Sequence, residues 1–347
     1  MDPLPQQSSP DKSWPEVALA VLCPVLLVAL IGACVNLFLP IESLKPHVNE
    51  WALSKVVVYE QLAQQTDQRL FVFGDSTAAG FSLPFEETIQ GRLEARYAAG
   101  ELPLQPINVS LVASGYRDPY SVAGHFDLTA QDVVLLQINT APELNENFYQ
   151  VIYQTAADDR LPELIRPQRE TPYTSEIERT VNCWFRDAFP LLALSEVYED
   201  SVRSRLRGAN RRAEGERRRS LWYGETPLPE DQQAAARREY AEPTTEERTH
   251  ALELYREVAR KLQTAFGDAR VIVYLNPLNR EYLEAEAGVD WESLRQWSQQ
   301  LETVFRREGI EIANLAEFLP SEQFFDDNHP DAAGSERLAR EFVRLIH

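Results

Sequence analysis

Short apolar runs alternate with longer stretches of helical periodicity through most of this chain. Five runs are rich in β-branched residues and bounded by glycine, asparagine or proline, which predicts strands at residues 70–73, 107–112, 133–138, 271–275 and 310–313. Helical periodicity predicts helices over residues 84–98, 118–129, 246–266, 290–308 and 331–346. Strands that alternate with helices indicate βαβ units, and therefore an α/β domain with a parallel sheet covered on both faces.

The N-terminal segment has a different pattern, because residues 17–39 contain no charged side chain. A helix needs about 20 apolar residues to span the bilayer hydrocarbon, so we expect a single transmembrane anchor here. A cleaved lipoprotein signal is the alternative, since Ile31-Gly32-Ala33-Cys34 resembles a lipobox with Cys34 as the lipidated residue. The mainly acidic residues before the apolar run argue against it, because signal peptides usually begin with positive charge.

These patterns divide the chain into a short tail at 1–16, the anchor at 17–39, a helical linker at 40–69 and the α/β domain at 70–347. Residues 141–245 carry many charges, several prolines and no convincing strand, so we interpret them as a mostly helical insertion between the third and fourth strands. Arginines cluster at 203–219 within it. They form either a solvated helix face balanced by glutamates or a contact for an anionic polymer or lipid headgroups.

Composition excludes several classes of function. Lys and Arg number 34 against 54 Asp and Glu, which gives a net charge of −20 and argues against a nucleic-acid partner. Three cysteines are too few for a disulfide scaffold. None of them are paired at the spacing of zinc ligands, so no structural metal is expected.

The first candidate for chemistry is Ser76, in Gly74-Asp75-Ser76 at the end of the first predicted strand. Ligands bind beyond the carboxyl ends of the strands in open parallel sheets, so the Ser76 hydroxyl would face a ligand. Its own N–H, close to a helix start, would donate to a developing oxyanion. The tripeptide alone favours the simpler interpretation, a turn serine that caps the next helix.

The second candidate is His329, in Asp326-Asp327-Asn328-His329-Pro330 before the last predicted helix. A serine nucleophile needs an adjacent base, and a histidine oriented by a carboxylate supplies one. The spacing of Asp326 allows a turn that places its carboxylate on the imidazole, and Asp327 competes for this role. We expect Pro330 at the first position of the following helix.

Two further positions fit the role of oxyanion donors. Gly115 follows the second predicted strand, where a glycine lets a backbone N–H approach a substrate oxygen. Asn139 follows the third, where its amide would donate to the same oxygen. Each is weak alone, since Gly115 also suits a turn and Asn139 a strand-end cap. All these groups fall at carboxyl ends of different strands, and that convergence favours one active site.

In this order the motifs resemble the SGNH or GDSL family of serine hydrolases. Gly74-Asp75-Ser76 matches its first block, Gly115 its second, Asn139 its third, and Asp326 with His329 its fifth. The third block usually reads Gly-x-Asn-Asp, and here it reads Gln137-Ile138-Asn139-Thr140. The resemblance implies a flavodoxin-like parallel sheet, a catalytic Ser76–His329–Asp326 triad, an oxyanion hole from Ser76, Gly115 and Asn139, and no metal or organic cofactor.

A narrower likeness lies in the C-terminal third, where the segment beginning Asn276-Pro277-Leu278-Asn279 is similar to DltD proteins and to SGNH-like proteins of alginate acetylation. Those are membrane-anchored outside the cytoplasm and work with a membrane-bound O-acyltransferase. This resemblance implies an extracytoplasmic esterase or O-acyltransferase that acts on acyl esters of a cell-surface polysaccharide or teichoic-type polymer.

Two other functions remain open at this stage. One is a lipase or thioesterase on small acyl esters, and the other is a non-catalytic scaffold of a polysaccharide modification or export complex. For the catalytic reading we expect Ser76 and His329 side chains within about 4 Å. We also expect activity that rises through roughly pH 6–8 as His329 becomes neutral.

Overall fold

The computed structural model describes residues 68–80, 83–111, 126–140, 230–285 and 287–347, with single positions between 59 and 66 and at 119 and 123. All of them belong to the second of the chain's two units, residues 45–347. The predicted anchor at 17–39, Cys34, Gly115 and the arginine cluster at 203–219 lie outside the described residues. No helix in the described ranges has both the length and the apolar character that a bilayer crossing requires.

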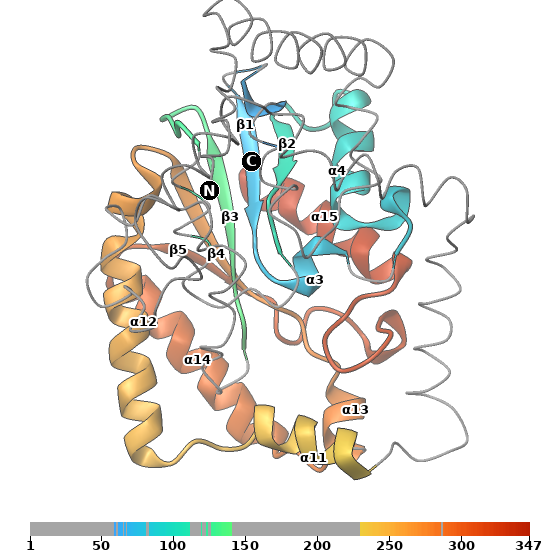
Figure 1. Ribbon diagram of the computed structural model, residues 1–347, viewed down its shortest axis with the longest axis vertical. Helices are drawn as coiled ribbons and strands as arrows, with labels where there is room; N and C mark the ends of the chain where they lie inside the picture. The colour runs from blue at the N-terminus through green and yellow to red at the C-terminus, as the bar shows by residue number, and fades with distance from the viewer. Residues whose placement is uncertain are drawn as a thin grey trace, which may run out of the picture. The chain divides into compact units, whose positions relative to one another are not determined.

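Five parallel strands form one sheet in the order β2-β1-β3-β4-β5 (Figure 1). Their bounds are β1 Arg69–Phe73, β2 Gln105–Asn108, β3 Val133–Ile138, β4 Arg270–Leu275 and β5 Glu311–Asn314. This is the flavodoxin-like order, in which the direction of strand progression reverses between β1 and β3. The parallel α/β sheet that the sequence predicts is confirmed, and its reversal point lies where Ser76 follows β1.

Helices cover both faces of the sheet, with α4 and α15 on one face and α12 and α14 on the other (Figure 1). The described helices are α3 Ser76–Ala79, α4 Ile89–Ala98, α11 Glu230–Glu239, α12 Thr245–Phe266, α13 Arg280–Ala285, α14 Trp291–Arg307 and α15 Ala332–Ile346. Two short 3-10 turns are η2 Phe85–Glu87 and η5 Ser321–Gln323.

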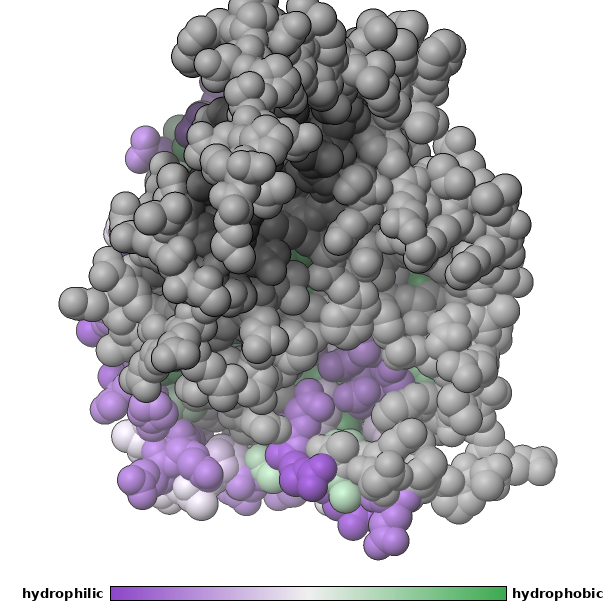
Figure 2. Space-filling view, viewed as in Figure 1, coloured by the Kyte–Doolittle hydropathy of each residue, from purple (hydrophilic) through white to green (hydrophobic). Residues whose placement is uncertain are grey.

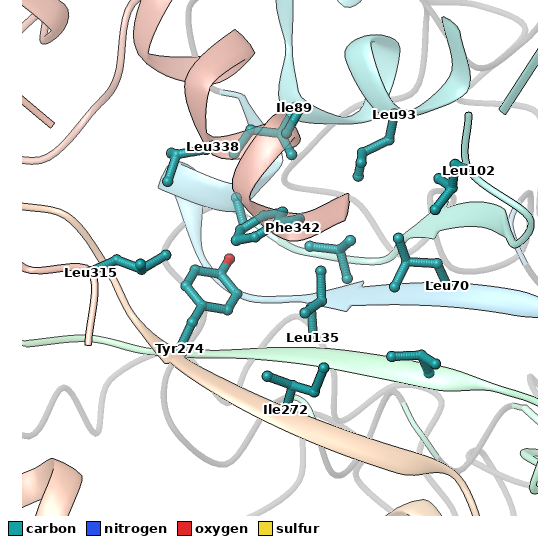
Figure 3. Close-up of a cluster of buried hydrophobic side chains, with 14 of the residues drawn as sticks. Leu70, Ile89, Leu93, Leu102, Leu135, Ile272, Tyr274, Leu315, Leu338 and Phe342 are labelled. Atoms are coloured by element: carbon teal, nitrogen blue, oxygen red, sulfur yellow. The ribbon is translucent and has the colours of Figure 1, made fainter. Parts of the chain in front are cut away.

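The core lies between the sheet and these helices. Figure 3 shows Leu70, Leu135 and Tyr274 on the strands meeting Leu93 of α4 and Phe342 of α15. The rings of Tyr274 and Phe342 are 4.8 Å apart at their centroids. Burial of each large apolar side chain stabilises the fold by about 1.5–3 kcal/mol, so this packing holds α4 and α15 against the sheet.

The opposite face is covered in the same way, because the Phe73 ring lies 5.2 Å from the Phe266 ring of α12. On α14 the apolar stripe that includes Trp297 and Phe305 is buried. The polar sides of such helices face water: Figure 2 shows a mainly hydrophilic described surface along the edge where Figure 1 places α11, α12 and α13.

A buried ion pair ties the amino-terminal end of β1 to the turn before β3. Arg69 Nη2 lies 2.6 Å from Asp132 Oδ2, and both side chains are almost completely buried. The Asp132 carboxylate also accepts hydrogen bonds from the N–H and hydroxyl of Thr129. The pair therefore fixes the start of the two central strands whose other ends carry the candidate chemistry.

The observed elements differ from the predicted ones at their ends. The helix predicted over 84–98 is divided at Thr88, whose hydroxyl accepts from Gly91 N–H and starts α4 anew. β2 ends at Asn108 rather than at 112, and there the Asn108 side chain accepts from Ser110 N–H. The chain nevertheless stays beside β1, since Val109 N–H donates to the Val72 carbonyl and Leu111 N–H to the Gly74 carbonyl. Residues 126–129, at the end of the helix predicted over 118–129, are irregular.

Candidate active site

The nucleophile candidate lies on a tight strand-to-helix turn. β1 ends at Phe73, and Ser76 is the first residue of α3. The Asp75 carboxylate caps this short helix by accepting from Thr77 N–H at 2.8 Å. Gly80 ends it with φ of 76°, a left-handed conformation that suits glycine. Ser76 is partly exposed while Thr77 and Ala78 are buried, so the turn presents the serine toward the open edge of the sheet.

His329 and Asp326 lie in the loop between η5 and α15. His329 Nδ1 is 2.9 Å from each carboxylate oxygen of Asp326. Asp326 Oδ1 also accepts from the backbone N–H of His329 at 2.8 Å and of Asn328 at 3.2 Å. Because an ionised carboxylate only accepts, the Nδ1 atom carries a proton, and in the neutral form of His329 the Nε2 atom is then the acceptor. The turn that the spacing of Asp326 predicts is therefore present.

The structure brings the two distant parts of the sequence together. His329 Nε2 lies 2.8 Å from Ser76 Oγ, well within the expected 4 Å. A second bond joins the same two segments, since the Thr77 hydroxyl donates to the carbonyl of Asn328 at 3.3 Å. Ser76, His329 and Asp326 thus form a continuous hydrogen-bonded chain at the carboxyl edge of the sheet.

Electrostatics make His329 a stronger base than an isolated imidazole. Burial alone would lower the pKa of His329, but the Asp326 carboxylate outweighs it and, with Asp327 and Asp75, raises the pKa to about 9. Burial would raise the pKa of Asp326, yet the pKa is lowered because His329 and two backbone N–H groups stabilise the carboxylate. The pair therefore favours an imidazolium beside a carboxylate, the charge distribution that follows proton transfer from serine.

Asp327, the competitor for the acid role, has a different partner. Its Oδ2 accepts from the Tyr240 hydroxyl at 2.7 Å, and Asn328 Nδ2 donates to the same hydroxyl at 3.3 Å. Burial and the neighbouring Asp326 carboxylate raise the pKa of Asp327 to about 6. Asp326 and not Asp327 therefore faces Nδ1 of His329, although Asp327 adds to the negative potential there.

The candidate oxyanion donors are placed only in part. Phe73 of β1 and Leu136 of β3 are the last residues that these two strands pair with each other. Ser76 follows Phe73 by the same number of residues as Asn139 follows Leu136. Asn139 is partly exposed, and Thr140 after it is fixed because its N–H donates to Asn276 Oδ1 at 2.6 Å. Both candidates therefore lie at the same edge of two neighbouring strands. Gly115 lies outside the described residues.

Three residues that support this arrangement were not predicted from the sequence to have a role in the site. Asn279 donates through Nδ2 to the Asp326 carbonyl at 2.8 Å and through its backbone N–H to the Asp327 carbonyl at 2.7 Å. Tyr240 holds Asp327, and Gln137 donates to Asp75 at 2.7 Å. Asn279 belongs to the segment that carries the narrower family likeness, but nothing in its spacing predicts the loop it supports.

The proline after the histidine has another role than expected. α15 begins at Ala332 and is capped by Asp331, which accepts from Ala333 N–H and Gly334 N–H. Pro330 therefore precedes the cap, and it pairs with Phe324 in an isolated antiparallel bridge. Phe325 N–H also donates to the His329 carbonyl at 2.8 Å. The bridge, rather than the first turn of the helix, fixes the backbone around His329.

Asp326, Asp327 and His329 are also the one group in the described ranges whose ligand-type atoms lie close enough for a shared cation, within 4.8 Å of one another. Both oxygens of Asp326 face His329 Nδ1, and Asp327 accepts from Tyr240. These atoms are engaged with one another and with Ser76, an arrangement suited to proton transfer.

The sequence matches no protein-family model and none of the curated proteins. Among solved structures it is similar to a carbohydrate acetylesterase from Sinorhizobium meliloti, at 13% identity and a TM-score of 0.36. It is also similar to a protein from Agrobacterium tumefaciens provisionally described as an arylesterase, at 11% identity and a TM-score of 0.38. Each likeness covers 80% of this chain and 98% of the other. At these values the function has to be argued from the site itself.

Proposed function

We propose that this protein is a serine-dependent acyl-transfer enzyme, an esterase or O-acyltransferase, that forms an acyl-Ser76 intermediate. The observation that carries the proposal is the bonded chain from Ser76 Oγ through His329 to Asp326, at 2.8 and 2.9 Å. It lies where ligands bind in sheets of this order. A helix-capping serine would have no need of a buried Asp–His pair aimed at its hydroxyl.

In the first half of the reaction, Ser76 Oγ attacks the carbonyl carbon of an ester and its proton passes to His329 Nε2. Asp326 keeps the Nδ1 proton in place and stabilises the imidazolium that forms. The carbonyl π electrons move to oxygen, and donors such as Ser76 N–H and the Asn139 amide would stabilise this oxyanion. Collapse of the intermediate breaks the ester C–O bond, and His329 returns the proton to the leaving alcohol.

In the second half, water or a hydroxyl of an acceptor attacks the acyl-serine carbonyl while His329 takes its proton. Ser76 then leaves as the alcohol and recovers the proton from His329. Water as the acceptor gives net hydrolysis, and a sugar or polymer hydroxyl gives net transfer. Every step uses groups of this chain and the two substrates, so the proposal needs no cofactor.

We further propose that the enzyme is membrane-anchored through residues 17–39 and acts outside the cytoplasm on acyl esters of an envelope polymer. The uncharged stretch at 17–39 and the motif likeness of the C-terminal third support this. A membrane-bound O-acyltransferase is the partner that this likeness implies. Fractionation of cells that express the full chain tests the anchor, because exchange of two apolar residues at the centre of 17–39 for lysine should release the protein from membranes.

The catalytic proposal is tested by labelling the full-length chain with a fluorophosphonate, which reacts only with activated serines. We expect labelling of the wild type, none of Ser76→Ala, and normal labelling of Ser293→Ala, a serine on α14 that binds Asp290. Labelling that persists in Ser76→Ala, or a folded wild type that does not react, would overturn the proposal. A parallel assay with short acyl esters and an added sugar acceptor separates hydrolysis from transfer.

A further inference from the structure

We propose that Gln137 is a positioning residue for the nucleophile, which it holds in place through Asp75. This inference rests on the proposed function, because it assigns a role in presenting Ser76 for attack. Gln137 belongs to β3 and Asp75 follows β1, and these are the neighbouring strands between which the sheet order reverses. The contact therefore joins the two strands at the point where the site lies.

The side-chain amide of Gln137 is oriented by partners of opposite type. Its Nε2 donates to Asp75 Oδ1 at 2.7 Å. Its Oε1 accepts from the backbone N–H of Asp75 and from the Tyr274 hydroxyl, each at a longer 3.4 Å. A carboxylate only accepts and an N–H only donates, so the amide cannot rotate by half a turn without losing these bonds. Gln137, Asp75 and Tyr274 are all buried.

The contact between Gln137 and Asp75 is directly connected to the turn that carries Ser76. The same oxygen, Asp75 Oδ1, accepts from Gln137 and from Thr77 N–H, and it thereby caps the helix that Ser76 begins. Gly74 completes the fit, because a Cβ at this position would overlap Gln137 Oε1 and would lie 2.8 Å from Gln137 Cβ. The glycine leaves room for the amide to reach Asp75, so the two residues act as a matched pair.

The simpler reading is that Gln137 is a buried polar group that satisfies its own hydrogen bonds. The two readings differ in what happens when the contact changes its charge. Burial raises the pKa of Tyr274 and the Asp326 carboxylate raises the pKa of His329, and the charge of Asp75 adds to both effects. A second negative charge at position 137 should therefore affect His329, the base of the proposed triad. An apolar residue of the same size adds no charge.

The test compares Gln137→Glu and Gln137→Met by their rates of fluorophosphonate labelling from pH 6 to 9, each divided by the wild-type rate. Two carboxyl groups this close cannot both ionise readily, so one proton is retained well above the ordinary pKa. While it is retained, Glu at 137 donates to Asp75 as the amide does. Once it is lost, repulsion displaces the turn, and we expect the ratio to fall at least about tenfold toward pH 9.

Gln137→Met keeps the volume of the side chain but removes all three of its hydrogen bonds. We expect a labelling rate lowered by about tenfold to a hundredfold, because a displacement of about 1 Å has effects of that size, and a ratio to wild type that changes little with pH. Gln299→Glu, at an exposed position of α14, is the matched control and should label as the wild type does at every pH. Circular dichroism at pH 6 and 9 gives the folded fraction by which rates are normalised.

Several outcomes would overturn the inference. One is a Gln137→Met variant that labels at the wild-type rate, and another is a pH-independent ratio for Gln137→Glu. A third is a loss in Gln137→Met that disappears when rates are normalised to folded protein. A wild type that is folded but does not label contradicts the proposed function instead, so the two failures are distinguishable.

Discussion

Replacement of Asp326 by Asn is the substitution that most directly tests how the site works. It keeps the size of the side chain and an oxygen that can accept from the backbone N–H groups of His329 and Asn328, but it removes the negative charge. That charge is the main reason that the pKa of His329 is raised to about 9, while burial acts to lower the pKa. With the charge removed, burial remains and only the Asp327 and Asp75 carboxylates still oppose it, so the pKa of His329 should fall from about 9 toward its ordinary value.

The size of the effect follows from the two values. Only neutral His329 can accept the serine proton, so at pH 7 a pKa of about 9 leaves about 1% of the wild-type sites active. The wild-type rate should therefore rise through about pH 9, higher than the pH 6–8 expected from the sequence, because Asp327 and Asp75 add their charges to that of Asp326. The variant should reach its plateau at a lower pH than the wild type.

The height of the plateau should fall as well, because an asparagine no longer stabilises the imidazolium. The corresponding change in a serine-protease triad lowers turnover by about 10⁴-fold. Since the wild type is mostly inactive at neutral pH, the defect should be about 10⁴-fold near pH 10 and at least about tenfold smaller near pH 7. A defect that shrinks toward neutral pH is specific to loss of charge, because simple loosening of the loop would lower the rate equally at all pH values.

The assay is the rate of fluorophosphonate labelling of the full-length chain from pH 5 to 10, with circular dichroism to follow folding. Asp327→Asn is the matched control, and it should move the pH midpoint of the rate by less than Asp326→Asn, since Asp327 contributes less to the pKa of His329. The reasoning is refuted if Asp326→Asn leaves the midpoint near pH 9 or if Asp327→Asn moves it further.

Three predictions concern stability, each measured by urea unfolding. Tyr240→Phe should lower the free energy of unfolding by about 1.5–3 kcal/mol at pH 8 and by less at pH 5. The reason is that the lost hydrogen bond stabilises the ionised form of Asp327, whose pKa is about 6. An equal loss at both pH values would contradict this. Arg69→Met should lower the free energy of unfolding by about 3–5 kcal/mol, because the Asp132 carboxylate is left buried without its cation. The double variant Arg69→Met with Asp132→Asn should recover part of this loss. A double variant with no recovery would count against the ion pair. The raised pKa of His329 contributes stability that is fully present below about pH 6.5 and is lost as pH rises through about 9, so His329→Gln should flatten the pH dependence in that interval.

The sequence predicts the sheet well because its three central strands, β1, β3 and β4, are short, nearly continuous apolar runs. The third predicted strand, Val133–Ile138, has the observed bounds, and the others differ by a few residues at their ends. Local side-chain bonds accompany such ends: Thr88 divides a predicted helix, and the Asn108 side chain binds Ser110 N–H where β2 ends. Such bonds depend on where a side chain meets the backbone, which hydrophobic periodicity does not report.

The placement of Ser76, Asp326 and His329 could be anticipated for a topological reason. All three follow predicted strands or precede a predicted helix, and the carboxyl ends of parallel strands meet at one edge of a sheet. The supporting residues could not be anticipated in this way. Gln137 and Asn279 act through contacts between segments that are distant in sequence, so no local spacing announces them.

The bond between Tyr240 and Asp327 has a consequence for how the region between β3 and α12 can change. That region leaves the sheet beside Asn139 and Thr140, and it returns with Tyr240 bound next to His329. Both of these attachment points are fixed by their own contacts, Thr140 to Asn276 and Tyr240 to Asp327. A change in the length of the chain between them is therefore expected to leave Ser76, His329 and Asp326 of the proposed triad in place.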